Sequence, residues 1–261
     1  MDFLVVASGF VVGAVVGAIV GLTGVGGGSL MTPLLVLLFG VSPVTAVGTD
    51  LLFAAITKTG GAWAHARRGG VDWTIVGRLA AGSVPAAVLT LVGLHFFVAD
   101  SKALAQVVSV GLGVALMLTA AALLFREPLR RWAERRGRVL PPSGTAAKRT
   151  VIFGAVLGVL VSVSSVGAGA LGVTALFFLY PGLAAARIVG TDIAHAVPLT
   201  LVAGLGHAAA GVVDWPLLAS LLVGSLPGIW LGSRLGSALP ERVLRGALAT
   251  MLVLIGGKLV F

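Results

Sequence analysis

Residues 103–125 read ALAQVVSVGLGVALMLTAAALLF and contain no charged side chain. An α-helix needs about 20 consecutive apolar residues to cross the hydrocarbon core of a bilayer, so this stretch predicts a transmembrane helix. Similar apolar stretches follow one another along nearly the whole chain, and no long stretch shows the two-residue alternation of a membrane β-barrel. The sequence therefore predicts an all-α integral membrane protein.

Composition supports this class. Of the 261 residues, 58% are hydrophobic and only 10% are charged, whereas a soluble domain carries about 25% charged residues. The mean hydropathy is +1.10. The chain has no cysteine, which excludes disulfides and thiolate metal ligands, and its four histidines lack the close spacing of a zinc site. We therefore expect neither a metal site nor a cofactor.

Most of the net charge of +9 lies in one stretch, residues 126–149. This stretch holds eight of the 18 Lys and Arg residues and two Glu, and hence a charge of +6. A basic stretch between apolar segments is typical of a cytoplasmic loop, and it suits the anionic headgroups of membrane lipid. We expect a cytoplasmic linker with lipid as its neighbour and no nucleic-acid partner.

The two halves of the chain on either side of this linker share four sequence blocks in the same order. VGTD at 47–50 recurs at 189–192, VDW at 71–73 recurs at 213–215, and GSVP at 82–85 recurs as GSLP at 224–227, all at an offset of 142 residues. The glycine-rich run 23–30 matches 164–171 at an offset of 141. An internal duplication explains this agreement. The predicted domains are a first transmembrane repeat, 1–125, the linker, 126–149, and a second transmembrane repeat, 150–261.

Each half divides into a span, a glycine-rich break, a short apolar segment and three further spans. The expected spans are 3–22, 44–66, 73–94 and 103–125 in the first half, and 150–166, 185–208, 215–238 and 242–261 in the second. The stretch 3–22 follows Met1-Asp2 without a basic segment, so we interpret it as a retained span and not as a signal peptide. The short segments, 29–40 and 170–181, have about 12 residues or about 18 Å of helix, less than the core thickness of about 30 Å. They are half-helices, re-entrant elements, or crossings completed by non-helical backbone.

The distribution of Lys and Arg favours one topology. If every segment crosses, the repeats have five segments each and are inverted, and the N-terminus lies outside. In that arrangement 15 basic residues lie on the cytoplasmic side and two outside, with Lys58 buried. If the short segments do not cross, the repeats have four spans each and run parallel, and the count is 12 against five. The positive-inside rule favours the inverted arrangement.

The two glycine-rich breaks are the predicted binding site. Glycine lets the backbone leave the helical conformation and approach a ligand, and a short helix that begins after the break directs its positive dipole end at that point, which suits an anion. Inverted repeats with broken helices are typical of secondary transporters. For any single glycine, tight helix packing stays open as the alternative. The substrate-binding candidates in the breaks are Gly26, Gly27, Gly28, Ser29, Ser165, Gly167 and Gly169.

The run GLTGVGGGSLMTPLLVLLFGVSPVTAVGTDLL at 21–52, followed by GGAWAHARRGGVDW at 60–73 and then GSVP, resembles the TauE/SafE (sulfite exporter) family of membrane proteins. The resemblance implies a multi-pass transporter of the bacterial or archaeal cytoplasmic (inner) membrane for sulfur-containing anions such as sulfite or organosulfonates, and it is compatible with a homodimer. It adds Thr49 and Thr191, from the two Gly-Thr pairs, to the substrate-binding candidates. A small polar residue, often Ser, commonly follows Gly-Thr in the family, whereas this chain has Asp50 and Asp192.

Four ionisable residues within the spans are functional candidates, because such residues are costly in a membrane. Asp50 and Asp192 are related by the repeat, and they are expected either to bind a proton or cation during transport or to cap their helices. Lys58 lies about two turns from Asp50 and is expected to be a buried counter-ion of an anionic substrate or of an aspartate. His195, one turn after Asp192, is a further candidate for proton or ion coupling.

Together these features predict a secondary transporter of a small anion, sulfite or an organosulfonate, which works by alternating access and is coupled to protons. An anion or cation channel, and a cation- or proton-coupled carrier of a non-sulfur solute, stay open as alternatives. An enzyme is not expected, because the sequence has no cysteine, no HExxH motif and no convincing nucleophile–base pair.

Overall fold

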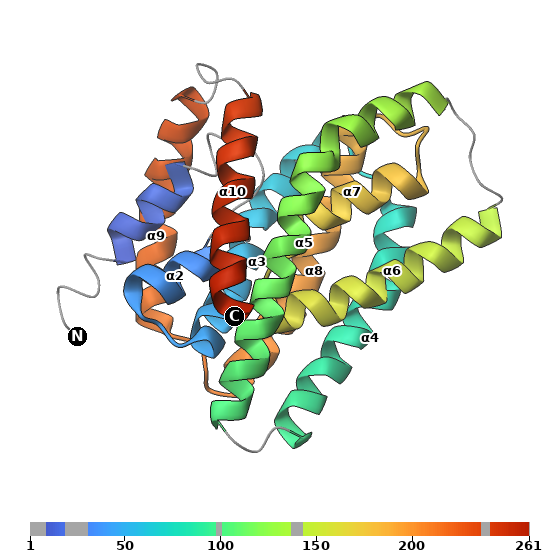
Figure 1. The fold of residues 1–261 in the computed structure, drawn as a ribbon. Coiled ribbons are helices and arrows are strands. Elements are labelled where there is room, and N and C mark those ends of the chain that lie inside the picture. The colour runs from blue at the N-terminus through green and yellow to red at the C-terminus, as the bar shows by residue number, and fades with distance from the viewer. Residues whose placement is uncertain (1–8, 19–30, 98–100, 137–142, 236–240, 261) are drawn as a thin grey trace.

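The computed structural model describes residues 9–18, 31–97, 101–136, 143–235 and 241–260. Within these ranges the regular structure is helical, without a β-strand (Figure 1). Residues Gly9–Ala18 form the first helix. It is followed by α2 (Met31–Phe39), α3 (Pro43–Arg67), α4 (Trp73–Phe97), α5 (Ser101–Arg136), α6 (Ser143–Ser164), α7 (Ala170–Leu179), α8 (Ala185–Ala209), α9 (Trp215–Leu235) and α10 (Glu241–Val260).

The surface of this bundle is that of a membrane protein. Four helical stretches are long and apolar enough to cross a membrane: Trp73–Phe96, Lys102–Phe125, Gly144–Ser164 and Ala185–Ala209. Large apolar side chains point outward along several helices, such as Leu89 (70% exposed), Leu226 (70%) and Leu254 (69%). In water such a surface drives association, whereas lipid solvates it. The predicted class, an all-α membrane protein, is confirmed.

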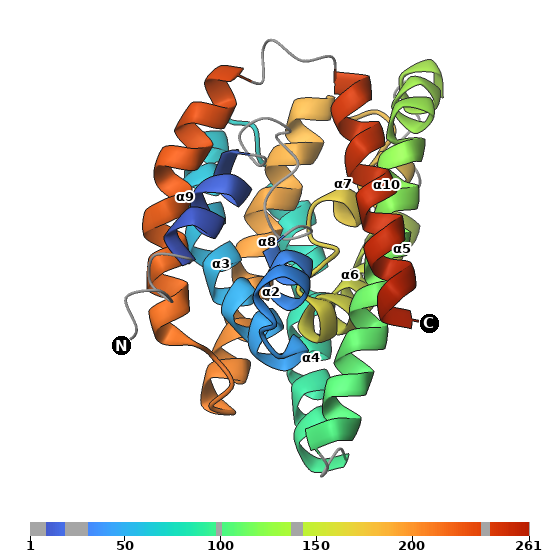
Figure 2. The ribbon, with the colours of Figure 1, turned by 60° about the vertical axis from the view of Figure 1, so that its left-hand side comes forward.

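The two repeats run in opposite directions, as the packing of α3 on α8 demonstrates. The side chain of Leu52 packs on Gly204, and Ile193 packs on Gly61. Moving forward along α3 from Leu52 to Gly61 therefore corresponds to moving backward along α8, so the helices are antiparallel. Since α3 and α8 are equivalent in the two repeats, the repeats are inverted. These two helices lie in the middle of the molecule, with α9 on one side and α5 and α10 on the other (Figure 2).

The outer helices pack on the opposite repeat through glycines. At Gly82 of α4, the carbonyl oxygen of Val151 in α6 occupies the space that a Cβ would take. The symmetry-related contact lies between Gly224 of α9 and the carbonyl oxygen of Phe10 in the first helix. Small residues let helix backbones approach closely in membranes. The first helix of each repeat therefore packs on the fourth helix of the other, α4 or α9, so that the repeats are interlocked.

The short helix α7 returns the chain to the side from which α6 started. The hydroxyl of Tyr180, directly after α7, lies 2.7 Å from the hydroxyl of Thr150 near the start of α6. Arg187, at the start of α8, forms an ion pair with Asp72, at the start of α4, with a distance of 3.4 Å between Nη2 and Oδ2. Arg187 therefore lies at the same end of the bundle as the end of α3. This is the side that the inverted topology gives it.

The basic stretch is largely helical where it is described, because α5 continues to Arg136 and α6 begins at Ser143. The helices Trp73–Phe97 and Trp215–Leu235 each begin directly after the Asp of the repeated VDW block. Asp72 Oδ1 accepts hydrogen bonds from the backbone N–H groups of Thr74 and Ile75, both at 3.2 Å. Asp214 Oδ1 accepts from the N–H of Leu217 at 2.9 Å.

Candidate solute-binding site

The second glycine-rich break, residues 165–169, separates α6 from α7. Ser165 (φ 59°), Gly167 (φ 127°) and Gly169 (φ 139°) all have positive φ, which the helix cannot accommodate. Gly169 is the N-cap of α7, and no side chain there accepts a hydrogen bond from the helix. The first backbone N–H groups of α7 therefore lie next to the break without a side-chain cap. The first break, with Gly26, Gly27, Gly28 and Ser29, lies outside the described residues, so those candidates stay predictions.

Asp50 contacts both the second break and α2. Its side chain is fully buried. The hydroxyl groups of Thr32 and Ser165 donate to Oδ2 at 2.5 and 3.0 Å. Oδ1 has no hydrogen-bond partner among the residues that the structure describes. The carboxylate therefore joins the short helix of its own repeat to the break of the other repeat.

Neither aspartate caps a helix. α3 begins at Pro43, and Ser42 is its N-cap, with the Ser42 hydroxyl accepting from the N–H of Thr45 at 3.2 Å. Asp50 lies two turns further on, and Asp192 has the equivalent place in α8, which begins at Ala185. Of the two interpretations of these carboxylates, helix capping is therefore wrong.

Lys58 extends from α3 to the same break. This half-buried side chain donates from Nζ to the carbonyl oxygen of Ala168 at 2.9 Å. Its charge interacts with the carboxylates of both Asp50 and Asp192. The second repeat has Thr200 at the equivalent position, and the Thr200 hydroxyl donates to the carbonyl of Ala196 within its own helix at 2.8 Å. The site is therefore asymmetric, with one cation whose charge interacts with two carboxylates.

Asp192 lies against the short helix of its own repeat. Its side chain is 1% exposed. Its carboxylate occupies the space that a Cβ at Gly172 of α7 would take. Gly172 is the repeat equivalent of Met31, the neighbour of Thr32, so each aspartate faces the short helix that precedes its own span.

His195 belongs to a neighbouring contact between α8 and α4. Its fully buried ring places Nε2 2.8 Å from the hydroxyl of Ser83. Nδ1 has no hydrogen-bond partner within the described part of the chain. The hydrogen bond to Ser83 fixes the ring beside the aspartates but not on them, so a role for His195 in ion coupling stays a prediction.

Thr49 and Thr191 bind backbone of the opposite repeat. The hydroxyl of Thr191 accepts from the N–H of Asp72 at 2.9 Å, and that of Thr49 accepts from the N–H of Asp214 at 3.1 Å. Both threonines are fully buried. Their geometry is that of structural contacts between the repeats, and substrate binding by either hydroxyl stays a prediction.

Three contributors to the site were missed from sequence: Thr32, Ser83 and the carbonyl of Ala168. Ser83 lies in the repeated GSVP block, so the repeat itself was a signal for it. Thr32 had none, because its repeat equivalent is Val173. Within the described residues no group of three or more His, Asp or Glu side chains is arranged to hold a metal ion.

Comparison with known proteins gives the family. The sequence profile of the family described as "Sulfite exporter TauE/SafE" matches residues 9–259. This chain belongs to the TauE/SafE sulfite exporter family. The resemblance inferred from the glycine-rich run and the VGTD and VDW blocks is thereby confirmed.

Relatives of this TauE/SafE protein cover almost its whole length. It is 40% identical over 249 residues to "Probable membrane transporter protein YjnA" of Bacillus subtilis (strain 168), which covers 95% of this chain and 97% of that relative. It is 31% identical over 249 residues to "Probable membrane transporter protein YdhB" of the same organism, with 94% and 96% covered. A "Probable membrane transporter protein" of Xylella fastidiosa (strain Temecula1 / ATCC 700964) is 27% identical over 232 residues, with 87% and 83% covered. No solved structure matches the chain.

Proposed function

We propose that this TauE/SafE protein is a secondary transporter of a small anion, sulfite or a short organosulfonate, and that it works by alternating access in the cytoplasmic membrane. The observation that carries the proposal is the position of Lys58. Its ammonium group contacts the broken segment at Ala168, and its charge interacts with two buried carboxylates on antiparallel helices of the two repeats.

Lys58 and α7 together suit an anion. Nζ donates to the carbonyl oxygen of Ala168, two residues before α7 begins at Ala170. The N-terminus of α7 adds a partial positive charge and backbone N–H groups that no side chain caps. The N–H of Gly172 donates to the Gly167 carbonyl of the break at 3.3 Å, and the N–H groups of Ala170 and Leu171 precede it. A lysine and a helix N-terminus without a side-chain cap at one point of a membrane interior form a site that attracts negative charge.

The charges of the site support proton coupling. With Asp50 and Asp192 ionised and Lys58 protonated, the three groups carry one net negative charge, which opposes the entry of an anion. In a medium of low dielectric constant this repulsion is large. A proton taken up by one carboxylate removes it, so anion and proton bind together and cross together. We assign the proton to Asp50, because its carboxylate contacts the break directly through the hydroxyl of Ser165.

The inverted repeats support alternating access. The site lies where α3 of one repeat meets the break of the other, and α3 and α8 cross there antiparallel. Each half therefore offers a similar surface to the site from opposite sides of the membrane. Rocking of one repeat against the other about such a site is the usual mechanism of inverted-repeat transporters.

The two carboxylates favour a second candidate, a cation- or proton-coupled carrier of a non-sulfur solute. In this case Lys58 would serve only to compensate one aspartate. The transported solute would then need no negative charge. A channel differs from both candidates because its flux neither saturates with solute concentration nor is coupled to the movement of a second ion.

Flux of radiolabelled sulfite in proteoliposomes tests the proposal, with and without an imposed pH gradient. We expect saturable uptake that the gradient drives and that short sulfonates inhibit, with empty liposomes as the control. If none of these anions is transported, the sulfur-anion assignment is wrong. If flux is present but shows no saturation and no response to the gradient, the protein is a channel.

A further inference from the structure

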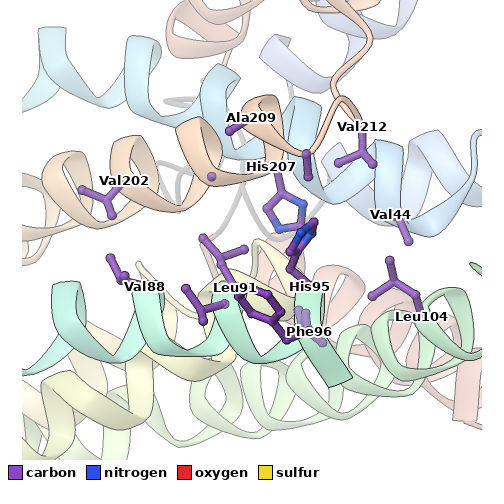
Figure 3. A pocket seen from close by; sticks show the side chains of 14 residues that line it. Val44, Val88, Leu91, His95, Phe96, Leu104, Val202, His207, Ala209 and Val212 are labelled. Atoms are coloured by element: carbon purple, nitrogen blue, oxygen red, sulfur yellow. The ribbon is translucent and has the colours of Figure 1, made fainter. Parts of the chain in front are cut away.

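A cavity of about 520 Å³ lies between the C-terminal halves of α4 and α8 (Figure 3). Its walls are largely apolar and include Leu91, Leu104 and Val202. The imidazoles of His95 and His207 also line it (Figure 3). Mostly apolar walls with a few polar groups are typical of cavities that bind small molecules.

His207 forms one wall of this cavity and connects it to α3 and α6. The residue is 4% exposed. Its Cβ packs against Gly48, where an added Cβ would lie 3.0 Å away. Its Nε2 lies 2.9 Å from the carbonyl oxygen of Ser162. Since a carbonyl oxygen only accepts, Nε2 carries the hydrogen and donates this bond.

The same two segments hold Asp50. Gly48 precedes Asp50 by two residues in α3, and Ser162 precedes Ser165 by three. The hydroxyl of Ser165 donates to the Asp50 carboxylate at 3.0 Å. The ring of His207 therefore lines the cavity and contacts the two segments that carry Asp50 and Ser165, at Gly48 and at Ser162.

The cavity lies at the end of the bundle that is poor in basic residues. It contacts residues near the start of α3 (Val44) and of α5 (Leu104), and residues near the ends of α4 (Phe96) and of α8 (Ala209). The basic ends of these helices, with Arg67, Arg187 and the stretch after Phe125, are the opposite ends. By the positive-inside rule the cavity faces the outer side of the membrane.

We infer that this cavity is the outer access path of the transported anion, and that His207 is the gate that closes it above Asp50. The inference rests on the proposed function. Opening requires the imidazole to leave one acceptor, the Ser162 carbonyl, and to swing into the cavity, where there is space for it. The apolar walls suit the hydrocarbon part of an organosulfonate, and the two imidazoles suit its sulfonate group.

Single cysteines test the access path, because the natural chain has none. The variants Val202→Cys and Leu104→Cys place a thiol on the cavity wall. Val223→Cys, on the outward face of α9 (61% exposed), is the matched control for a lipid-facing helix surface, and Trp63→Cys, near the basic end of α3, is the control for the inner side. The probe is a membrane-impermeant methanethiosulfonate that carries a sulfonate group, added to intact cells.

We expect the probe to modify Val202→Cys and Leu104→Cys in intact cells, to leave Val223→Cys unmodified, and to reach Trp63→Cys only after the cells are permeabilised. Modification should abolish sulfite flux. An excess of a short alkanesulfonate, which does not react with the probe as sulfite does, should slow the modification. If the cavity cysteines react only after permeabilisation, the cavity faces inward and the inference is wrong. If they do not react at all, or react without loss of flux, the cavity is not the path. The side from which the probe reaches each cysteine is measured without flux, so this part of the test stays informative even if sulfite is not the substrate.

A second pair of variants tests the gate. Ser165→Cys places a thiol beside Asp50, and we expect the probe to modify it slowly when His207 is present. In the double variant Ser165→Cys/His207→Ala, modification should be much faster, whereas Ser165→Cys/His95→Ala should keep the slow rate. Equal rates in all three variants would show that His207 does not close the path.

Discussion

The hydroxyl of Thr191 in the second repeat accepts a hydrogen bond from the backbone N–H of Asp72 in the first repeat, at 2.9 Å. Thr49 and Asp214 form the symmetry-related pair at 3.1 Å. Each threonine lies directly before a membrane aspartate of its own repeat, and each partner N–H begins a helix of the other repeat. The two hydrogen bonds thus tie the segments that carry the two carboxylates to the starts of α4 and α9.

Replacing Thr191 by Val should destabilise the protein. The N–H of Asp72 would lose its acceptor in a partly buried position, which costs about 1–3 kcal/mol. Thermal unfolding in detergent measures the effect, with Thr191→Ser, which keeps the hydroxyl, as the control. Equal unfolding temperatures for the Val and Ser variants would show that this hydrogen bond contributes nothing to stability.

The glycine contacts between α4 and α6 predict a second difference in stability. Gly82→Ala would place a Cβ on the carbonyl oxygen of Val151, so the helices must separate, which costs about 1–3 kcal/mol. Gly77→Ala, in the same helix, meets nothing within 4 Å and should stabilise the helix by up to about 1 kcal/mol. The opposite order of the two unfolding temperatures would contradict this packing.

The sequence predicted the helices well, because the length of an apolar run in a membrane protein is set by the bilayer. The expected span 73–94 is observed as Trp73–Phe97, and the short segment 170–181 is observed as Ala170–Leu179. The inverted direction of the repeats followed from the distribution of Lys and Arg. The packing of the first helix of each repeat on the other repeat could not be predicted in this way. A glycine in a helix indicates close packing but does not say which helix packs there.

The candidate site was predicted only in part. Asp50 and Lys58 were accessible from sequence because a charge within an apolar span is conspicuous. Whether Asp50 caps a helix depended on where α3 begins, and a boundary that lies two turns earlier, at Pro43, decides against it. Contacts of the backbone, such as the Ala168 carbonyl on Lys58, and of small hydroxyls, such as Thr32, depend on tertiary structure that no local pattern encodes.

Only the first repeat contributes a lysine to the site, so we predict that replacing Lys58 by its counterpart in the second repeat impairs transport. Lys58→Thr gives the first repeat the residue that the second has at Thr200, and it removes the positive charge that interacts with both aspartates. We expect saturable sulfite flux to be lost. Lys148→Thr, which removes an exposed lysine at the start of α6, is the matched control and should keep flux unchanged. Unchanged affinity for sulfite in Lys58→Thr would show that the lysine does not attract the anion.

The charge balance of the site predicts the effect of pH. In the natural protein, lowering the pH on the side that holds the anion should accelerate its transport, because protonation of a carboxylate removes the net negative charge that opposes binding. Asn has nearly the shape of Asp and can accept from Thr32 and Ser165 through its carbonyl oxygen, so Asp50→Asn should fold and should keep anion binding. It carries no proton to exchange, and sulfite flux should therefore no longer respond to an imposed pH gradient, whereas downhill flux should persist. Proteoliposomes of the natural protein, Asp50→Asn and Asp192→Asn measure this directly. A full response to the gradient in Asp50→Asn, together with loss of the response in Asp192→Asn, would transfer the coupling proton to the second repeat.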